Sequence, residues 1–300
     1  MDTFFNILMV VCFFPIAPIL YFVLRNHTKP KKNLIINVTL PLEAQEDEQV
    51  LAYCKTYRKR LGIAALAFTV IFPVVFLIQS FSIVLTFFMS WLTIVISVMY
   101  GIYSKYHMKL KRLKKERGWA SKSGADAQVD EDDHWIGGIL YYNPNNKQTL
   151  VSERVGINMS VNIAKPAGKV LIAIAALTLI AMPFFGIAFM PMEFTPLRIE
   201  VTDQAVIMRH STTISIDLDD IVEVELREEL RPIARQVGTN LPTLYAGRWL
   251  ISNIGTATLR LNPQHPPFIV IKTEGTTYIF GTSDVERTFE AFAELQQRFG

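Results

Sequence analysis

The chain has 300 residues, of which 50% are hydrophobic, and it carries a net charge of +3 with a mean hydropathy of +0.27. These values lie between those of a soluble enzyme and those of an all-membrane transporter, so they exclude both extremes and place about a third of the chain in lipid. Cys12 falls in an apolar segment and Cys54 in a polar one, so a stabilising disulfide is not expected.

Four stretches without a charged side chain dominate the sequence. Each holds roughly 20 or more mostly apolar residues, enough helix to cross the ~30 Å hydrocarbon core of a bilayer. The stretches are Thr3–Leu24, Leu61–Ser80, Phe81–Ser104 and Val170–Met192. They predict four transmembrane helices, and prolines at 15, 18, 73 and 183 are expected to bend them. The first helix is expected to stay in the protein, because it lacks the basic start of a signal peptide.

Basic residues gather beside one end of every predicted helix. Residues 25–60 carry eight Lys and Arg against four Asp and Glu, and residues 104–167 carry eleven against seven. Residues 193–300 carry ten against fifteen. Because Lys and Arg beside helix ends stay in the cytoplasm, we expect the N-terminus and the C-terminal domain to lie outside the cell membrane. The inverted orientation is the alternative.

Residues 1–33 comprise the first helix and its basic flank, and the polar segments 34–60 and 105–133 flank the helical hairpin 61–104. Residues 34–60 predict a short extended piece followed by an amphipathic helix on the inner surface. Residues 105–133 predict a basic extension of the third helix and then an acidic linker. We expect the extension to attract anionic lipid headgroups rather than nucleic acid. Its expected membrane-surface residues are Lys109, Lys111, Arg112, Lys114 and Lys115.

Residues 134–168 predict a small cytoplasmic β-hairpin domain before the fourth helix (169–192). The run from Asn143 to Asn146 has turn chemistry between two strand-like segments. Trp135, Tyr141 and Tyr142 suit a position at the lipid headgroups. Asp130 to Asp133 with His134 has two interpretations, a metal site or a solvated linker, and we favour the linker because no second ligand group lies at a supporting spacing.

Residues 193–300 alternate apolar and polar residues in eight short runs separated by Gly, Pro, Asn and Asp. This pattern predicts an antiparallel sheet or barrel of about seven strands. The segment from Val285 to Phe299 carries one apolar stripe at helical spacing, which predicts a C-terminal helix. The runs are Leu197–Val201, Ala205–Arg209, Thr213–Leu218, Ile221–Arg227, Arg248–Ile251, Thr256–Leu261, Phe268–Thr273 and Thr276–Gly281.

Three segments resemble known bacterial families. The stretch from Val38 to Arg58 resembles the inner loop of bacteriocin-immunity-type membrane proteins, and Trp135 to Asn162 resembles a small domain of unknown function found in them. Residues 194–300, with Pro267-Phe268-Ile269 and Tyr278-Ile279-Phe280, resemble the bacterial pleckstrin-homology-like (PH-like) domain. The resemblance implies a multi-pass protein of the bacterial cell membrane. The expected fold is therefore membrane α-helical with four transmembrane helices, followed by an α+β PH-like barrel with a C-terminal helix.

Two functions of different classes agree with these features. The first is a non-enzymatic, membrane-anchored binding or sensor protein, whose PH-like domain contacts a peptide, a lipid or an envelope protein. Its expected binding residues lie in Arg227–Arg248, interpreted as the longest loop of the domain, although glutamates in and beside it offer the alternative of a neutralised, solvated face. These residues are Arg227, Arg231, Arg235, Tyr245, Arg248 and Trp249. The second function is immunity to a membrane-active peptide toxin, exerted through the helices.

Catalysis, cofactor binding and transport are not expected. In the C-terminal domain, only His210 and Ser211 place a histidine beside a hydroxyl nucleophile, and such pairs are common by chance. No charged residue lies at mid-membrane depth, which argues against a carrier. We therefore expect no metal and no cofactor, with the lipid bilayer as the first partner, and the ligand and the oligomeric state are left open.

Overall fold

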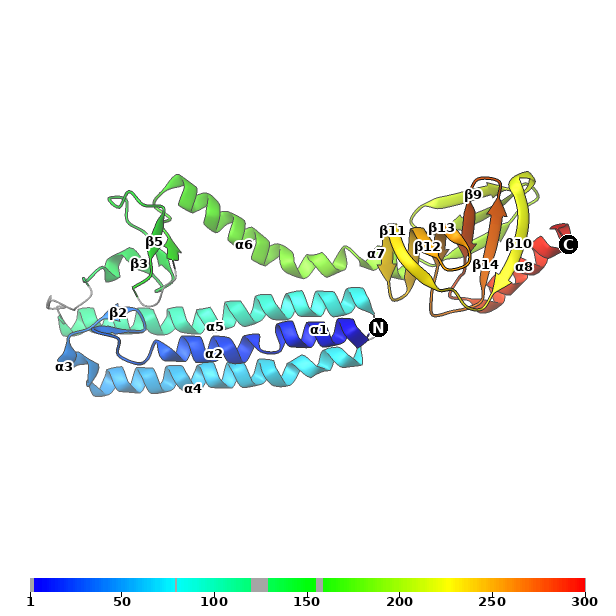
Figure 1. Cartoon of the computed structure of the whole chain (residues 1–300). Coiled ribbons are helices and arrows are strands. Elements are labelled where there is room, and N and C mark those ends of the chain that lie inside the picture. The colour runs from blue at the N-terminus through cyan, green and yellow to red at the C-terminus, as the bar shows by residue number, and fades with distance from the viewer. Residues whose placement is uncertain (1–2, 79, 120–128, 155–158, 300) are drawn as a thin grey trace. The chain divides into compact units, whose positions relative to one another are not determined.

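The computed structural model describes residues 3–78, 80–119, 129–154 and 159–299. Contacts along the backbone divide the chain into two compact units. One unit holds most of the helical spans and the segments between them, and the other holds the C-terminal module with the residues just before it. The elements of both are labelled in Figure 1, and each unit is described by itself.

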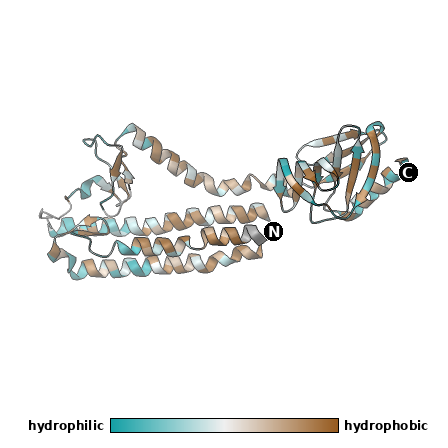
Figure 2. Ribbon diagram, in the orientation of Figure 1, coloured by the Kyte–Doolittle hydropathy of each residue, from teal (hydrophilic) through white to brown (hydrophobic). Residues whose placement is uncertain are grey.

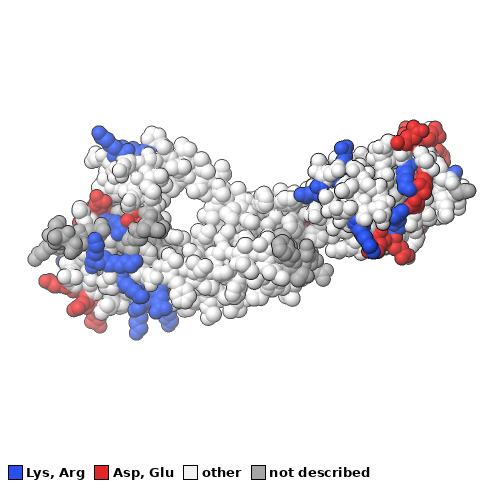
Figure 3. Space-filling model, in the orientation of Figure 1, with Lys and Arg blue, Asp and Glu red and all other residues white. Residues whose placement is uncertain are grey.

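Within the described residues, four helical spans are long and apolar enough to cross a membrane, as the sequence predicted. Hydrophobic residues line most of their length (Figure 2). On the face seen in Figure 3, this helical surface is free of charge, and Lys and Arg gather at its end near α3. The spans are Ile7–Asn26, Glu48–Leu77, Phe81–Arg117 and Pro166–Phe194.

Prolines mark two breaks in the spans. At Pro15 the first span divides into α1 (Thr3–Phe13) and α2 (Ile16–Asn26). At Pro73 the helix α4 (Glu48–Ile71) gives way to the tighter η1 (Phe72–Leu77). Both breaks follow from the missing N–H of proline, which removes one hydrogen bond of the helix. The fourth span consists of α6 (Pro166–Ile187), which keeps Pro183 inside it, and α7 (Met190–Phe194).

The helix α5 (Phe81–Arg117) has 37 residues and is therefore about 55 Å long, well beyond the ~30 Å of a bilayer core. Its charged end must project into water. Helix α4 is equally continuous, so the predicted helix of residues 48–60 runs directly into the second membrane span. Tyr57 joins α4 to α2, since its hydroxyl donates to Leu24 O at 2.9 Å.

Short elements connect the spans. Between α2 and α4 lie β1 (Leu34–Ile35), β2 (Val38–Thr39) and α3 (Leu42–Gln45). Between α5 and α6 lie η2 (Asp132–His134), β3 (Trp135–Ile136), β4 (Leu140–Tyr141), β5 (Leu150–Ser152) and β6 (Met159–Val161).

The predicted hairpin around Asn143–Asn146 is wrong, because strands pair β3 with β4 and β5 with β6, and this turn only links the two pairs. The buried side chain of Asn162 holds the linking turn, with its Nδ2 2.9 Å from Asn143 O and 3.3 Å from Asn146 O. A contact so distant in sequence leaves no local signal, and the sequence pattern therefore favoured the simpler hairpin.

The C-terminal module has nine strands in two sheets and the predicted final helix. One sheet has the order β7-β8-β9, and the other has the order β10-β14-β15-β13-β12-β11. The six-stranded sheet is open at β10 and β11 rather than closed as a barrel, and its β13 and β15 are parallel. The elements are β7 (Arg198–Val201), β8 (Ala205–Arg209), β9 (Thr213–Asp217), β10 (Ile221–Arg227), β11 (Pro232–Leu241), β12 (Leu244–Ile251), β13 (Gly255–Leu261), β14 (Phe268–Thr273), β15 (Thr277–Phe280) and α8 (Val285–Phe299).

The predicted long loop over Arg227–Arg248 is wrong, because strand β11 and the start of β12 occupy most of this segment. Strand β11 forms a hairpin with β12 whose register shifts twice, between Pro232 and Ala234 and between Arg235 and Val237. Because β11 is an end strand with almost every side chain exposed, its sequence lacks the alternation that marks a half-buried strand.

The six-stranded sheet buries apolar side chains on both faces. Ile269 and Ile271 of β14 face one core, which they share with α8 through Leu295. Phe268 and Val270 of the same strand face a second core around Trp249. Side chains of a strand alternate between faces, so β14 anchors both cores and positions the β11–β12 hairpin relative to α8.

Candidate functional site

The segments between the spans fold together against the charged end of α5, and we call residues 27–47, 103–119, 129–154 and 159–165 the juxtamembrane module. Two glycines let the β3–β4 turn approach the helix closely. A Cβ on Gly137 would lie 2.2 Å from Ser104 Oγ, and one on Gly138 would lie 2.8 Å from His107 Nδ1. Both glycines have positive φ angles, of 58° and 73°, so their backbone conformation also favours glycine.

Asp132 is the centre of the juxtamembrane module. Its side chain is 5% exposed and lies 2.6 Å from Lys114 Nζ and 2.5 Å from Arg154 Nη1. The backbone N–H of Thr39 also donates to its carboxylate, at 3.1 Å. One carboxylate thus joins β2, α5, η2 and the start of the segment after β5.

Lys114 is the main partner of Asp132. The side chain of Lys114 is only 8% exposed, and its ammonium donates to Asp130, to Asp132 and to Thr39 Oγ1 at 2.6, 2.6 and 2.7 Å. A buried ammonium with three acceptors has all of its N–H groups paired. Burial alone would raise the pKa of Asp130, but hydrogen bonds from Lys114 and Thr39 outweigh it and lower that pKa.

Arg154 supplies a second buried cation. Its side chain is 5% exposed, its Nη1 also donates to Asn37 O at 3.3 Å, and its guanidinium carbon lies 5.8 Å from the centre of the Trp135 ring. A cation over an indole face is favoured by the ring quadrupole. Charge, ring and backbone contacts together hold this arginine inside the module.

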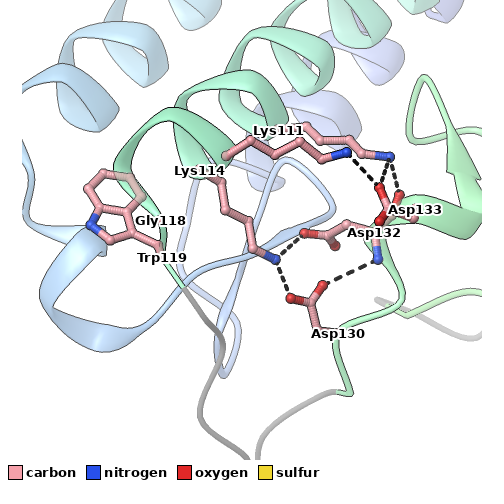
Figure 4. A pocket seen from close by; sticks show the side chains of 8 residues that line it. Lys111, Lys114, Gly118, Trp119, Asp130, Asp132 and Asp133 are labelled. Atoms are coloured by element: carbon pink, nitrogen blue, oxygen red, sulfur yellow. Dashed lines mark hydrogen bonds and ion pairs between the residues drawn. The ribbon is translucent and has the colours of Figure 1, made fainter.

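A hollow of about 340 Å³ opens beside this network (Figure 4). Lys111 and Lys115 each place Nζ 3.1 Å from the same Asp133 oxygen, and Asp133 is 76% exposed. These two lysines lower the pKa of Asp133 through hydrogen bonds, that from Lys115 being the stronger. The lining residues are Lys111, Lys114, Lys115, Gly118, Trp119, Asp130, Asp132 and Asp133.

The structure divides the residues that were predicted to meet the membrane surface. Lys114 is buried, and Lys111 and Lys115 are paired with Asp133, so these three charges serve contacts within the protein. Lys109 and Arg112 are exposed, and Lys109 also lies 5.5 Å from the ring centres of Tyr53 and Tyr106. A headgroup role for Lys109 and Arg112 stays a prediction.

The three aromatic residues of this region divide in the same way. Trp135 and Tyr141 are buried with ring centres 5.3 Å apart, which makes them core residues of the module. Tyr142 is exposed and stays a candidate for the headgroup level. The interpretation of Asp130 to Asp133 as solvated linker fails for Asp132, and the described residues contain no group of three possible metal ligands.

In the C-terminal module, the predicted binding residues lie on or beside the β11–β12 hairpin. Tyr245 and Trp249 stack with ring centres 4.7 Å apart, and Trp249 is buried in a core. Arg227 pairs with Glu225 at 2.7 Å, and Arg231 pairs with Glu229 at 3.1 Å. The neutralised-face alternative therefore describes these two arginines well.

Arg235 and Arg248 differ from the other arginines of the hairpin. Both are exposed, and neither has an ion pair within the part of the chain that the structure describes. Arg235 lies opposite Trp249 in the strand register, and Arg248 lies opposite Val237, which is 71% exposed. Directly opposed residues share a face of a sheet, so the two guanidinium groups start from opposite faces of the hairpin.

His210 and Ser211, the pair considered for catalysis, are in contact. His210 Nδ1 lies 3.1 Å from Ser211 Oγ, and its Nε2 lies 3.1 Å from Met192 O. Burial, with Arg260 nearby, lowers the pKa of His210. A backbone carbonyl, rather than a carboxylate, orients this imidazole, which gives it no stabilising charge of the kind that a triad provides.

Two residues central to the juxtamembrane module, Thr39 and Arg154, were not singled out from the sequence. Their partners lie 93 and 22 residues away along the chain, so no spacing motif connects them. The one available signal is the density of charge in residues 130–133, which follow the basic helix after an intervening segment, and the sequence analysis assigns it to the linker.

Asp132→Ala should destabilise the juxtamembrane module by about 3–5 kcal/mol, because it leaves two buried cations without their shared carboxylate. Asp133→Ala, its exposed neighbour, should cost only about 0–1 kcal/mol. Hydrogen exchange of the backbone amides of β3 to β6, measured on the full chain in lipid nanodiscs, distinguishes the two variants. Equal protection in the two variants would contradict a central role for Asp132.

The C-terminal module should become less stable at low pH, because Glu225 is then protonated and loses its ion pairs. Lys272 first, and Arg227 second, hold the pKa of Glu225 at about 2, below its usual 4.5. A lowered pKa stabilises the folded state above pH 4.5, and this contribution disappears as the pH falls towards 2. The free energy of unfolding should therefore be larger for the wild type than for Glu225→Gln at pH 7, and the two values should converge near pH 2. A difference that stays constant with pH would contradict the role of these ion pairs.

Comparison with known proteins concerns this C-terminal module. Residues 197–298, about a third of the chain, match the family described as Bacterial PH domain. No curated protein matches the chain, and no solved structure matches it. The resemblance of the earlier segments to bacteriocin-immunity-type proteins therefore stays a prediction. The match, the open sheet and the final helix identify residues 197–298 as a PH-like domain joined to four apolar helical spans.

Proposed function

We propose that the chain is a non-enzymatic, membrane-anchored binding protein whose PH-like domain contacts a peptide segment of an envelope protein. One observation carries the proposal: Arg235 and Arg248 stand exposed on an end hairpin without carboxylate partners among the described residues. Arginine is enriched in binding hot spots and grips carboxylates in bidentate fashion. Ile233 and Val237 of the same strand are exposed and supply apolar contact.

The charge of the partner follows from the charge of the hairpin. Arg227 and Arg231 are already neutralised by glutamates, so the hairpin offers Arg235 and Arg248 as its open cations. A partner with acidic and apolar side chains would complement both the arginines and the exposed aliphatic residues. The second function, immunity to a toxin through the helices, stays a prediction from the resemblance.

A photo-reactive amino acid in place of Val237, introduced into the full chain in living cells, tests the hairpin. The matched control is Val222, which is 67% exposed on β10 at the opposite end of the same sheet. We expect one cross-linked species from position 237 and none of it from position 222. Adding Arg235→Glu with Arg248→Glu should reduce that species at least about tenfold, since each charged contact is worth roughly 1.5–3 kcal/mol.

Two results would contradict the binding role. The same species could form equally from both positions, which would mean contact by proximity alone. The species could also persist undiminished in the charge-reversed variant, which would remove the arginines from the interaction.

The proposed orientation places the PH-like domain outside the cell and the juxtamembrane module inside, because every basic cluster beside a span then faces the cytoplasm. Alkaline phosphatase, which is active only outside, should be active when fused after Gly300 and inactive when fused after Lys165. Green fluorescent protein should give the reverse pattern. The opposite pair of results would invert the orientation and place the arginine-bearing hairpin in the cytoplasm.

A further inference from the structure

Asp133 forms ion pairs with two ammonium groups, and the buried network around Asp132 does not depend on these pairs. Lys111 and Lys115 lie one turn apart on α5, and each Nζ is 3.1 Å from Asp133 Oδ1. Lys111 is also fixed by its bond to Asp132 O at 2.6 Å. Asp133 is 76% exposed, so this carboxylate can turn outwards into water without leaving a buried charge unpaired.

The buried charged residues at the base of the pocket already have partners within the protein. Lys114 and Asp132 are buried and satisfied by one another, by Thr39 and by Arg154, so they shape the site without being free to bind. Trp119 forms part of the pocket wall. The volume of about 340 Å³ lies at the small end of the range of roughly 300–1,000 Å³ that holds small molecules.

We propose that this pocket binds a phosphate-bearing small molecule, whose phosphate replaces the Asp133 carboxylate between Lys111 and Lys115. A phosphate carries more negative charge than a carboxylate and has three acceptor oxygens, so it gains more from two ammonium groups on one rigid helix. Trp119 lines the same pocket, so its fluorescence can report on the bound molecule. Asp133 then acts as an internal competitor of the phosphate for the two ammonium groups.

Position along α5 favours a dissolved ligand over a lipid headgroup. The first charged residue of the helix is Lys105, and Lys111 and Lys115 follow it by six and ten residues, or about 9 and 15 Å of helix. The headgroup layer on each side of a bilayer is only about 5–7 Å thick. The lysine pair therefore lies at the outer edge of the headgroup layer or beyond it, which favours a dissolved ligand.

The test uses the full chain in phosphatidylcholine nanodiscs, titrated with inorganic pyrophosphate. Binding is followed by calorimetry and by tryptophan fluorescence, with Trp119→Phe identifying the signal from the pocket. We expect Lys115→Ala to weaken binding at least about tenfold and Asp133→Asn to tighten it several-fold. Arg112→Ala, which removes an exposed cation without an ion pair among the described residues of the chain, should leave binding unchanged.

A second arm replaces phosphatidylcholine with phosphatidylglycerol and omits pyrophosphate. A Trp119 signal in this arm alone would assign the phosphate to lipid and overturn the dissolved ligand. Absence of a signal in both arms would overturn the site. Equal losses of pyrophosphate affinity in Lys115→Ala and Arg112→Ala would mean that the binding is only unspecific charge attraction. Unchanged affinity in Asp133→Asn would mean the same. These outcomes leave the PH-like domain and its cross-linking test untouched.

Discussion

The buried carboxylate of Asp132 is the contact on which the juxtamembrane module depends. It neutralises Lys114 and Arg154, two cations that could not otherwise remain inside the protein. Because its partners come from β2, from α5 and from the chain after β5, a single charge joins three segments of the chain. Removing Asp132 leaves Arg154 without its ion pair and Lys114 with Asp130 alone, so the contacts of the network support one another.

The fourth span contacts α5 through polar groups. At its end, Glu193 accepts hydrogen bonds from the backbone N–H groups of Phe81 and Ser82, at 2.8 and 2.7 Å. A carboxylate at a helix N-terminus satisfies free N–H groups and the helix dipole.

Neighbouring residues of the same type have opposite roles in this protein. Lys114 is buried and saturated, whereas Lys115, the next residue, is mostly exposed and shares an exposed carboxylate. On the hairpin, Arg231 is paired and Arg235 is open, although both appear in the sequence as arginines of one polar stretch. Helical rotation and strand register decide these differences, and neither follows from residue type.

The sequence by itself determined the four apolar spans, the charge asymmetry across them and eight of the nine strands of the PH-like domain, because hydrophobic length and alternation are local properties. The sequence pattern did not predict strand β11 because both of its faces are exposed. Its alternation of apolar and polar side chains is also lost at two register shifts. Only the tertiary structure decided which charges are buried together. Thr39, Lys114, Asp132 and Arg154 are far apart along the chain, and their contact arises from folding that brings the β1–β2 and β3–β4 turns against α5.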